Sequence, residues 1–229
     1  MNYVIPAPAT PVIPVAGSDA VFPVRRIFCI GRNYAEHAKE MGAVADRAQP
    51  MFFCKPADAI VAGDEVEVRY PPATQDLHHE VEMVVALARG GSDIAAEHAL
   101  EHVFGYGVGL DLTRRDLQAA AKAKGHPWDA AKAFDHSAPV SALHPAAAIG
   151  HPTGARLTLH VNDALRQDAD IATMIFPVAA IVHELSKLWT LAPGDLIYTG
   201  TPAGVAALAR GDRFVARLGD VATLRGRIF

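Results

Sequence analysis

The sequence is poor in cysteine, and its two cysteines form no paired motif. Cys29 and Cys54 are the only cysteines among 229 residues. Neither belongs to a Cys-x-x-Cys pair, which excludes that kind of metal or redox motif. Each stands in an apolar segment, so we expect two buried free thiols.

The chain also lacks a block of like charges and a long apolar run. Its formal net charge is −4, and without a basic stripe no nucleic-acid partner is expected. The longest apolar stretches are interrupted by His183, Glu184 and Lys187, so none should span a membrane. The amino terminus has no basic segment followed by an apolar run, so no signal peptide is expected. These features indicate a cytoplasmic protein.

What is present fits one globular domain with an arm. Hydrophobic residues make up 51% of the chain, which is enough for a full core at this length. Residues 1–23 are rich in proline and almost free of charge, so we expect an extended arm there. Residues 24–229 should then form a single domain.

Two glutamates one residue apart are the most informative feature. Glu80 and Glu82 open a run that continues to Leu87. Alternate side chains of a strand share a face, so both carboxylates point the same way. Apolar residues follow on both faces, which indicates a buried strand. Buried carboxylates repel each other unless a cation compensates them, and Mg²⁺, Mn²⁺ or Ca²⁺ prefers such hard oxygen ligands. For this pair alone, the alternative is a solvated strand end with two ordinary glutamates.

A third carboxylate, Asp111, follows the glycine-rich segment 104–110. Three glycines in a predicted strand indicate that other backbone or a ligand comes close. Thr113 and Asp116 have the spacing of a capping box, which predicts a helix over residues 116–124. Taken alone, Asp111 would be a turn aspartate bonded to its own backbone. Together with Glu80 and Glu82, it fits a Mg²⁺ that keeps open positions for water and substrate.

Short predicted strands outnumber predicted helices. Strands are expected at residues 24–30, 51–54, 59–61, 65–70, 80–87, 104–112, 132–139, 157–161 and 196–199. Besides the helix after Asp111, helices are expected at 35–41 and from Pro177 to Leu188. No regular βαβ alternation is present, so the pattern favours a sheet-dominated α+β domain over a doubly wound one.

Six motifs, in order along the chain, resemble those of the fumarylacetoacetate hydrolase family. They are Ile30-Gly-Arg-Asn-Tyr-Ala-Glu-His37, Leu77-His-His-Glu-Val-Glu82, Gly109-Leu-Asp-Leu-Thr-Arg-Arg-Asp-Leu-Gln118, Gly125-His-Pro-Trp-Asp-Ala-Ala-Lys-Ala-Phe-Asp135, Met174-Ile-Phe176 and Thr199-Gly-Thr-Pro-Ala-Gly-Val205. Within the family, the chain resembles most the compact bacterial fumarylpyruvate hydrolases and acylpyruvases, which share the proline-rich arm.

The resemblance implies a mixed β-roll fold, a homodimer and a metal-dependent hydrolase. Mg²⁺ or Mn²⁺ would be held by Glu80, Glu82 and Asp111. The implied reaction is the cleavage of a carbon–carbon bond in a 2,4-dioxo acid by water. For this subgroup the substrate would be fumarylpyruvate, split into fumarate and pyruvate in a gentisate-type route of aromatic catabolism.

The resemblance also gives roles to polar residues of the motifs. His37 and Glu40, three residues apart on one helix face, would activate the attacking water. Without the resemblance they would be a surface ion pair. Lys132, in an apolar segment predicted to be a strand, would face the developing oxyanion. Its alternative is an edge-strand lysine that discourages aggregation.

The remaining polar residues of the motifs would contact substrate or support the site. Gln118 and Thr201 would contact substrate, and Arg32 with Arg114 or Arg115 would bind its far carboxylate. Arg115 would otherwise be a buried structural arginine. His78 and His79 are expected to support the site or to belong to the core, since hard oxygen ligands suffice for the metal.

Two other functions are compatible with the sequence. The same scaffold can decarboxylate oxaloacetate or a related oxo-diacid, because both reactions pass through an enolate. A metal-binding protein without catalysis is a further alternative, which the retention of His37, Gln118 and Lys132 disfavours. The residues do not rank fumarylpyruvate, maleylpyruvate and acetylpyruvate as substrates, so a general acylpyruvase stays open.

Overall fold

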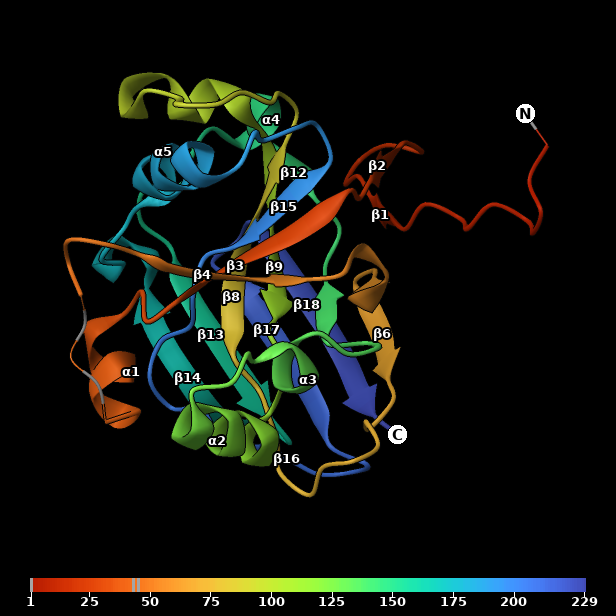
Figure 1. Ribbon diagram of the computed structural model, residues 1–229, viewed down its shortest axis with the longest axis vertical. Helices are drawn as coiled ribbons and strands as arrows, with labels where there is room; N and C mark the ends of the chain where they lie inside the picture. The colour runs from red at the N-terminus through yellow and green to blue at the C-terminus, as the bar shows by residue number, and fades with distance from the viewer. Residues whose placement is uncertain (1, 43, 45) are drawn as a thin grey trace.

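The computed structural model describes residues 2–42, 44 and 46–229 and shows a sheet-dominated α+β fold (Figure 1). The strands are β1 (Val12–Pro14), β2 (Val21–Pro23), β3 (Arg26–Gly31), β4 (Met51–Lys55), β5 (Ile60–Ala62), β6 (Glu65–Val68), β7 (Leu77–His78), β8 (Val81–Leu87), β9 (Val103–Leu110), β10 (Thr113–Arg114), β11 (Ala138–Val140), β12 (His144–Pro145), β13 (Arg156–Val161), β14 (Ala164–Asp170), β15 (Asp195–Tyr198), β16 (Ala207–Leu208), β17 (Arg213–Leu218) and β18 (Ala222–Ile228). The helices are α1 (Ala35–Glu40), α2 (Arg115–Lys124), α3 (Asp129–Lys132), α4 (Ala146–Ile149) and α5 (Val178–Leu188), with 3₁₀ turns η1 (Ala57–Ala59), η2 (Ala96–His102) and η3 (Ile171–Thr173).

Two large sheets pack face to face and enclose the main core. The first has the order β4-β3-β15-β8-β9-β11-β5 and mixes parallel with antiparallel pairs. The second has the order β14-β13-β17-β18-β6, and its strands β13, β17 and β18 contact β8 and β9. Val85, Val108, Leu159 and Leu224 fill the space between them without solvent exposure. The predicted mixed β-roll is therefore confirmed.

Strand β8 is buried along its whole length, as its sequence predicts. All seven residues from Val81 to Leu87 are shielded from solvent. The strand has β15 on one side and β9 on the other, so both of its edges are paired. A strand covered on both faces and paired at both edges requires apolar residues at nearly every position. Glu82 is the exception, which marks it for a function other than packing.

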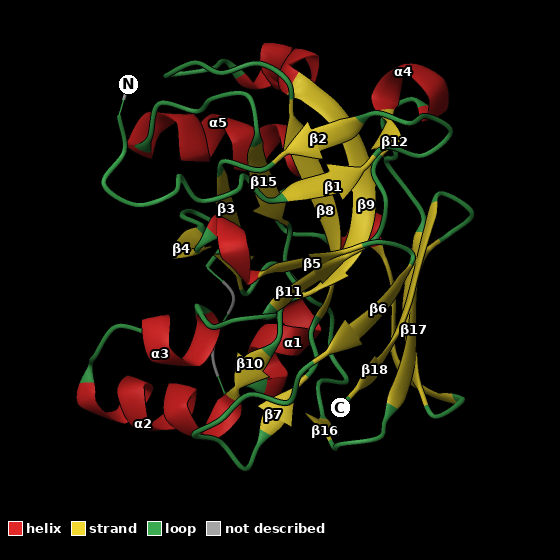
Figure 2. Ribbon diagram, turned by 90° about the vertical axis from the view of Figure 1, so that its right-hand side faces the viewer, coloured by secondary structure: helices red, strands yellow, loops and turns green. Residues whose placement is uncertain are grey.

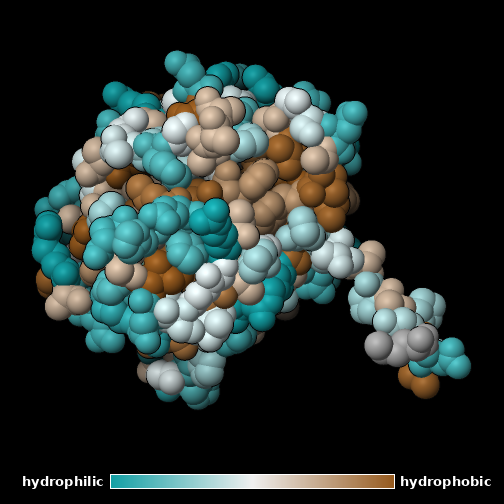
Figure 3. All heavy atoms as spheres, turned by 90° about the horizontal axis from the view of Figure 1, so that it is seen from above, coloured by the Kyte–Doolittle hydropathy of each residue, from teal (hydrophilic) through white to brown (hydrophobic). Residues whose placement is uncertain are grey.

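The amino-terminal segment divides into two parts. Strands β1 and β2 form a hairpin whose Ile13 and Phe22 pack into a second apolar cluster of the core. Residues 2–11 leave the body as an extended chain (Figure 3). Val4 in this segment is fully exposed. Residues 12–23 thus pack on the domain, and the domain boundary after residue 23 stays a prediction.

The helices gather at opposite ends of the roll. Helix α5 packs against η2 at one end. At the other end lie α1, α2 and α3 together with the small sheet β10-β7-β16 (Figure 2). The candidate site lies at this second end. Among the described residues, no helix is long and apolar enough to cross a membrane.

Three local predictions are wrong. Thr113 caps no helix, because it pairs with His78 in the β10–β7 ladder, and α2 begins at Arg115 without a side-chain cap at Arg114. Lys132 ends the short helix α3 instead of lying in a strand. Alanines surround Lys132, and alanine fits a helix better than a strand. Cys54 is exposed while Cys29 is buried, because alternate side chains of β4 point to opposite faces.

Candidate active site

Three carboxylates meet at the end of the β8–β9 pair. Glu80 precedes β8, Glu82 lies in it, and Asp111 follows β9 directly. The antiparallel register places Val81 opposite Leu110, and the Asp111 amide donates to the Glu80 carbonyl at 2.8 Å. One oxygen of each carboxylate lies within 4.8 Å of the others. All three side chains are almost completely buried. The structure thus brings the three predicted metal ligands together at one point.

The glycine-rich strand β9 lets neighbouring elements come close at this point. A side chain at Gly109 would meet the Pro139 carbonyl at 2.7 Å and the Tyr198 ring at 2.9 Å. Only glycine leaves that space free. It allows β11 and β15 to pack against β9, which places Asp111 at the site.

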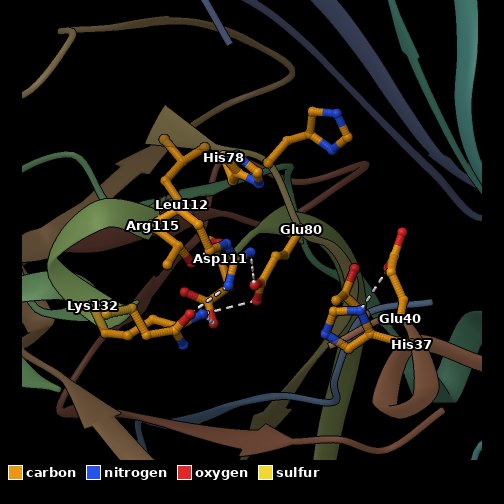
Figure 4. Close-up of polar contacts among 12 residues, drawn as sticks. His37, Glu40, His78, Glu80, Asp111, Leu112, Arg115 and Lys132 are labelled. Carbon is orange, nitrogen blue, oxygen red and sulfur yellow. Dashed lines mark hydrogen bonds and ion pairs between the residues drawn. The ribbon is translucent and has the colours of Figure 1, made fainter. Parts of the chain in front are cut away.

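Two lysines and an arginine contact two of the three carboxylates, and Figure 4 shows Lys132 and Arg115 beside Glu80 and Asp111. Lys132 Nζ lies 2.8 Å from Glu80 Oε2 and 2.7 Å from Asp111 Oδ2. Lys55 Nζ lies 2.8 Å from Asp111 Oδ1, and Arg115 pairs with Glu80 Oε1. Burial raises the pKa of Glu80, but the positive charges of Lys132 and Arg115 outweigh it and hold that pKa below its ordinary value. Burial lowers the pKa of Lys132, whereas Asp111 and Glu80 raise it, to about 12.

Glu82 differs from the other two carboxylates. Within the described part of the chain, no basic side chain lies within 4.0 Å of it, and its Oε2 accepts a hydrogen bond of 2.7 Å from the Gly200 amide. Burial raises its pKa well above the ordinary value, and the negative charges of Asp111 and Glu80 raise it further. An ionised Glu82 therefore requires a further cation at this point.

The donor set fits a hard divalent cation. Three buried carboxylates offer oxygen ligands only, and no basic side chain of the described residues forms an ion pair with Glu82. Mg²⁺ and Mn²⁺ prefer such ligands, while a zinc site would be expected to include nitrogen or sulfur. His79 is not available as a ligand through Nδ1, which donates to Gln167 Oε1 at 2.9 Å.

A pocket opens directly over the three carboxylates. Its lining includes the predicted residues Arg32, His37, Glu80, Glu82, Asp111, Arg115, Gln118, Lys132 and Thr201, together with Ile30, Gly31, Met41, Met51, Phe53, Lys122 and Trp128. Arg114 does not line it, because its guanidinium lies over the Phe134 ring, 4.4 Å from the ring centroid, and donates to the Ala130 carbonyl. Arg115 lines the pocket but is bonded to Glu80 and Gln118.

His37 and Glu40 form the predicted contact. His37 Nδ1 lies 3.2 Å from Glu40 Oε2, and the other oxygen of Glu40 accepts a 3.1 Å hydrogen bond from the Gly204 amide. With Nδ1 donating to Glu40, His37 Nε2 is left as an acceptor at the pocket. Figure 4 shows this pair on one side of the site and Lys132 on the other.

A buried asparagine fixes the turn that carries Arg32 and α1. Asn33 is fully buried, and its amide donates to the carbonyls of Thr199 and Phe176 at 2.8 and 3.0 Å. Its Oδ1 accepts a hydrogen bond of 2.7 Å from the Phe176 amide. The preceding residue, Arg32, has a left-handed backbone with φ of 60°. A non-glycine residue holds that conformation only where its surroundings enforce it, which is common at functional sites.

Sequence reasoning missed residues that hold the site from distant strands. Gln167 of β14 donates to Thr201 Oγ1 and to the Pro202 carbonyl, each at 2.8 Å, and thereby positions the loop after β15. Lys55 braces Asp111 from β4. Lys55 ends the largely apolar strand β4, which was its only available signal, whereas Gln167 lies in the mostly polar strand β14 and has no such signal. Neither sequence position shows which partner the side chain contacts.

The comparisons with known proteins identify the family. The sequence profile described as Fumarylacetoacetate (FAA) hydrolase C-terminal matches residues 26–229. The chain belongs to the fumarylacetoacetate hydrolase family. The sequence motifs had indicated this family, and the match confirms it.

Two solved structures are similar over nearly the whole chain. The fumarylpyruvate hydrolase of Pseudomonas aeruginosa, crystallised with Mn²⁺ and pyruvate, has a TM-score of 0.95 at 46% identity and covers 99% of both chains. A putative fumarylpyruvate hydrolase of Burkholderia cenocepacia has a TM-score of 0.93 at 52% identity, covering 100% of this chain and 98% of that one.

Other relatives carry a different activity. The mitochondrial oxaloacetate tautomerase FAHD1 of Rattus norvegicus is 42% identical over 204 residues, which is 89% of this chain and 91% of that protein. The oxaloacetate tautomerase YcgM of Escherichia coli is 41% identical over 196 residues, 83% of this chain and 87% of that protein. The relatives agree on 2,4-dioxo and related oxo acids as a class and differ in the reaction.

Proposed function

We propose that this protein is a divalent-metal-dependent hydrolase of 2,4-dioxo acids, with fumarylpyruvate as substrate and fumarate and pyruvate as products. The observation that carries the proposal is that His37, held by Glu40, lines the same pocket as three buried carboxylates. The similarity to two fumarylpyruvate hydrolase structures over almost the full chain supports the choice of substrate.

In the proposed reaction, the three carboxylates and His37 have different roles. Glu80, Glu82 and Asp111 would hold a Mg²⁺ or Mn²⁺, which would supply positive charge for the 2-oxo carboxylate end of the substrate and for the oxygen that becomes negative. His37 Nε2 takes a proton from water, while Glu40 holds Nδ1–H and stabilises the imidazolium that forms. The water oxygen adds to C4 of the substrate.

Bond cleavage then returns the proton. The C3–C4 bond breaks, its electron pair stays on the pyruvyl fragment, and C4 leaves as the carboxyl group of fumarate. The proton held at His37 Nε2 is transferred to C3, which completes pyruvate and restores the neutral imidazole. Lys132, Gln118 and Thr201 line the pocket around the reacting atoms and hold the substrate carbonyls by hydrogen bonds.

Oxaloacetate tautomerisation is the second candidate, because relatives at 41–42% identity have that activity. It needs a base that moves a proton between C3 and the enol oxygen, and His37 faces the same pocket. Decarboxylation of oxaloacetate and general acylpyruvase activity are further outcomes for the same residues, and a homodimer in the cytoplasm remains our expectation for the assembled protein.

One substrate panel tests these functions. Chelator-treated protein is assayed with fumarylpyruvate, maleylpyruvate, acetylpyruvate and oxaloacetate, before and after addition of Mn²⁺ or Mg²⁺, with products identified by NMR. We expect metal-dependent release of fumarate and pyruvate. Interconversion of enol- and keto-oxaloacetate without cleavage of any dioxo acid would replace the proposal by the tautomerase, and full activity in the chelated sample would reject the metal's role.

A further inference from the structure

Helix α2 lies along the pocket and presents three polar side chains to it. Arg115, Gln118 and Lys122 all line the pocket, at positions i, i+3 and i+7 of the helix. This spacing keeps them on one helix face. At a rise of about 1.5 Å per residue, Gln118 lies about 4.5 Å and Lys122 about 10.5 Å along the axis from Arg115. Because Arg115 contacts Glu80, the distance of a residue from Arg115 along the helix axis indicates how far that residue lies from the carboxylates.

The basic residues of the pocket fall into two groups. Arg115 and Lys132 are paired with Glu80 and Asp111. In the described part of the chain, neither Arg32 nor Lys122 has a carboxylate within 4.0 Å. Lys122 Nζ makes only a long contact of 3.5 Å, to the carbonyl of Met41 at the end of α1. The pocket lining therefore carries two basic side chains, the half-buried Arg32 and the exposed Lys122, that no acidic side chain of the described residues pairs with.

The pocket lining also has an apolar component. It includes the side chains of Met41, Met51, Phe53 and Trp128. Such a surface suits a planar unsaturated carbon chain whose ends are both charged. A ligand with a carboxylate at one end only would leave Arg32 and Lys122 without a carboxylate partner.

Substrate length separates the candidate ligands. An extended seven-carbon diacid places its two carboxylate carbons about 7 Å apart, whereas the four-carbon oxaloacetate spans about 4 Å. With one end at the three carboxylates, the shorter diacid ends near Gln118 and the longer one approaches Lys122. Acetylpyruvate has no second carboxylate.

We propose that Lys122, together with Arg32 of the same pocket, binds the far carboxylate of the substrate and thereby selects a seven-carbon dioxo diacid; this inference rests on the proposed hydrolase function. An ion contact at the exposed Lys122 contributes modestly, since solvent screens it. The contact should increase the affinity only for substrates that carry the second carboxylate. It should not change the chemical step at the three carboxylates.

The test compares Lys122→Met with Lys122→Arg and with the control Lys124→Met, an exposed lysine of the same helix that does not line the pocket. With Mn²⁺ present, Lys122→Met should raise KM for fumarylpyruvate about three- to tenfold and leave kcat and all acetylpyruvate constants near wild type. Lys122→Arg should restore most of the affinity, and Lys124→Met should change nothing. Equal KM changes on both substrates, or no change on fumarylpyruvate, would overturn the inference.

A binding experiment tests the role of Lys122 independently of the proposed catalytic function. Calorimetry with 2-oxopimelate and its monoacid analogue 2-oxoheptanoate, neither of which has the 4-carbonyl, compares ligands of equal chain length. Wild type should bind the diacid about three- to tenfold more tightly in the presence of Mn²⁺, and Lys122→Met should lose that difference. Equal affinities in wild type would reject the role of Lys122 even if fumarylpyruvate is hydrolysed. If wild type binds the diacid more tightly than the monoacid but hydrolyses no dioxo acid, the proposed function is rejected while the role of Lys122 in binding the far carboxylate is retained.

Discussion

Lys55 Nζ lies 2.8 Å from Asp111 Oδ1, and both side chains are shielded from solvent. The same ammonium group donates to the Leu112 carbonyl at 3.2 Å and to the carbonyl of Lys132. Lys55 thus connects β4, the segment after β9 and the end of α3. A single buried lysine fixes both the orientation of a candidate metal ligand and the helix that delivers Lys132.

Replacing this lysine should destabilise the protein. Lys55→Met keeps most of the side-chain volume but leaves Asp111 with one cationic partner instead of two. Breaking a buried ion pair typically costs about 3–5 kcal/mol of unfolding free energy, which urea denaturation of the metal-free protein would measure. The loss should be smaller with Mn²⁺ bound, because the ion returns positive charge to Asp111. The exposed Lys39→Met should change stability by less than about 0.5 kcal/mol. A Lys55→Met variant as stable as that control would contradict the bracing role.

Glu82→Gln should separate metal binding from stability. Glu82 is buried without a basic partner among the described residues, so a neutral amide of the same shape removes a repulsive charge without opening a cavity. We expect the metal-free variant to unfold at the same urea concentration as wild type or higher. Its affinity for Mn²⁺, measured by calorimetry, should fall at least about tenfold. The exposed Glu65→Gln is the control, and unchanged Mn²⁺ affinity in Glu82→Gln would remove Glu82 from the ligand set.

The sequence predicted the parts of the site that local periodicity defines. The alternation around Glu80 and Glu82 placed both at one end of a buried strand, and the i, i+3 spacing of His37 and Glu40 predicted their contact. In both cases the residues lie within three positions of each other along the chain, so local backbone geometry alone predicts their relation.

Contacts across large sequence separations could not be predicted in the same way. Gln167 reaches Thr201 from the second sheet, and Lys55 reaches Asp111 from β4, because the roll folds these strands over the site. The capping box at Thr113 failed for a related reason. Pairing with β7 draws Thr113 into a short strand, so a tertiary ladder replaces the local hydrogen bond that its sequence suggests.

Asp116 should make stability depend on pH in the acid range. Its carboxylate accepts hydrogen bonds from the Thr74 hydroxyl and from the amides of Gln75 and Leu117. Burial raises the pKa of Asp116, but these hydrogen bonds outweigh it and lower the pKa below the ordinary 3.8. A depressed pKa means that the contribution is complete above the unfolded-state value and is lost as pH falls through the folded-state value.

Asp116→Asn measures that contribution. At pH 7 the variant should lose about 1 kcal/mol or less of unfolding free energy, the scale of a lost acceptor at a helix start. The gap to wild type should narrow as pH falls below about 4, where the wild-type carboxylate becomes protonated. Urea titrations between pH 3 and 7 check this, with the exposed Asp58→Asn as control. A gap that widens on acidification would have the wrong sign for this explanation.

A variant of His37 can test catalysis without removing a candidate metal ligand. This residue is not in the ligand set, it lines the pocket, and its Nδ1 contacts Glu40. If it activates water, His37→Ala should lower kcat for fumarylpyruvate hydrolysis about 10²–10⁴-fold, with Mn²⁺ affinity near wild type. Glu40→Gln should have a smaller effect in the same direction, because it weakens the orientation of the ring without removing the base. Decarboxylation of oxaloacetate, which uses no attacking water, should suffer much less in His37→Ala than hydrolysis does. The exposed His98→Ala is the control for both reactions. Equal losses in hydrolysis and decarboxylation would assign His37 a structural role, and a normal hydrolysis rate in His37→Ala would require a different base.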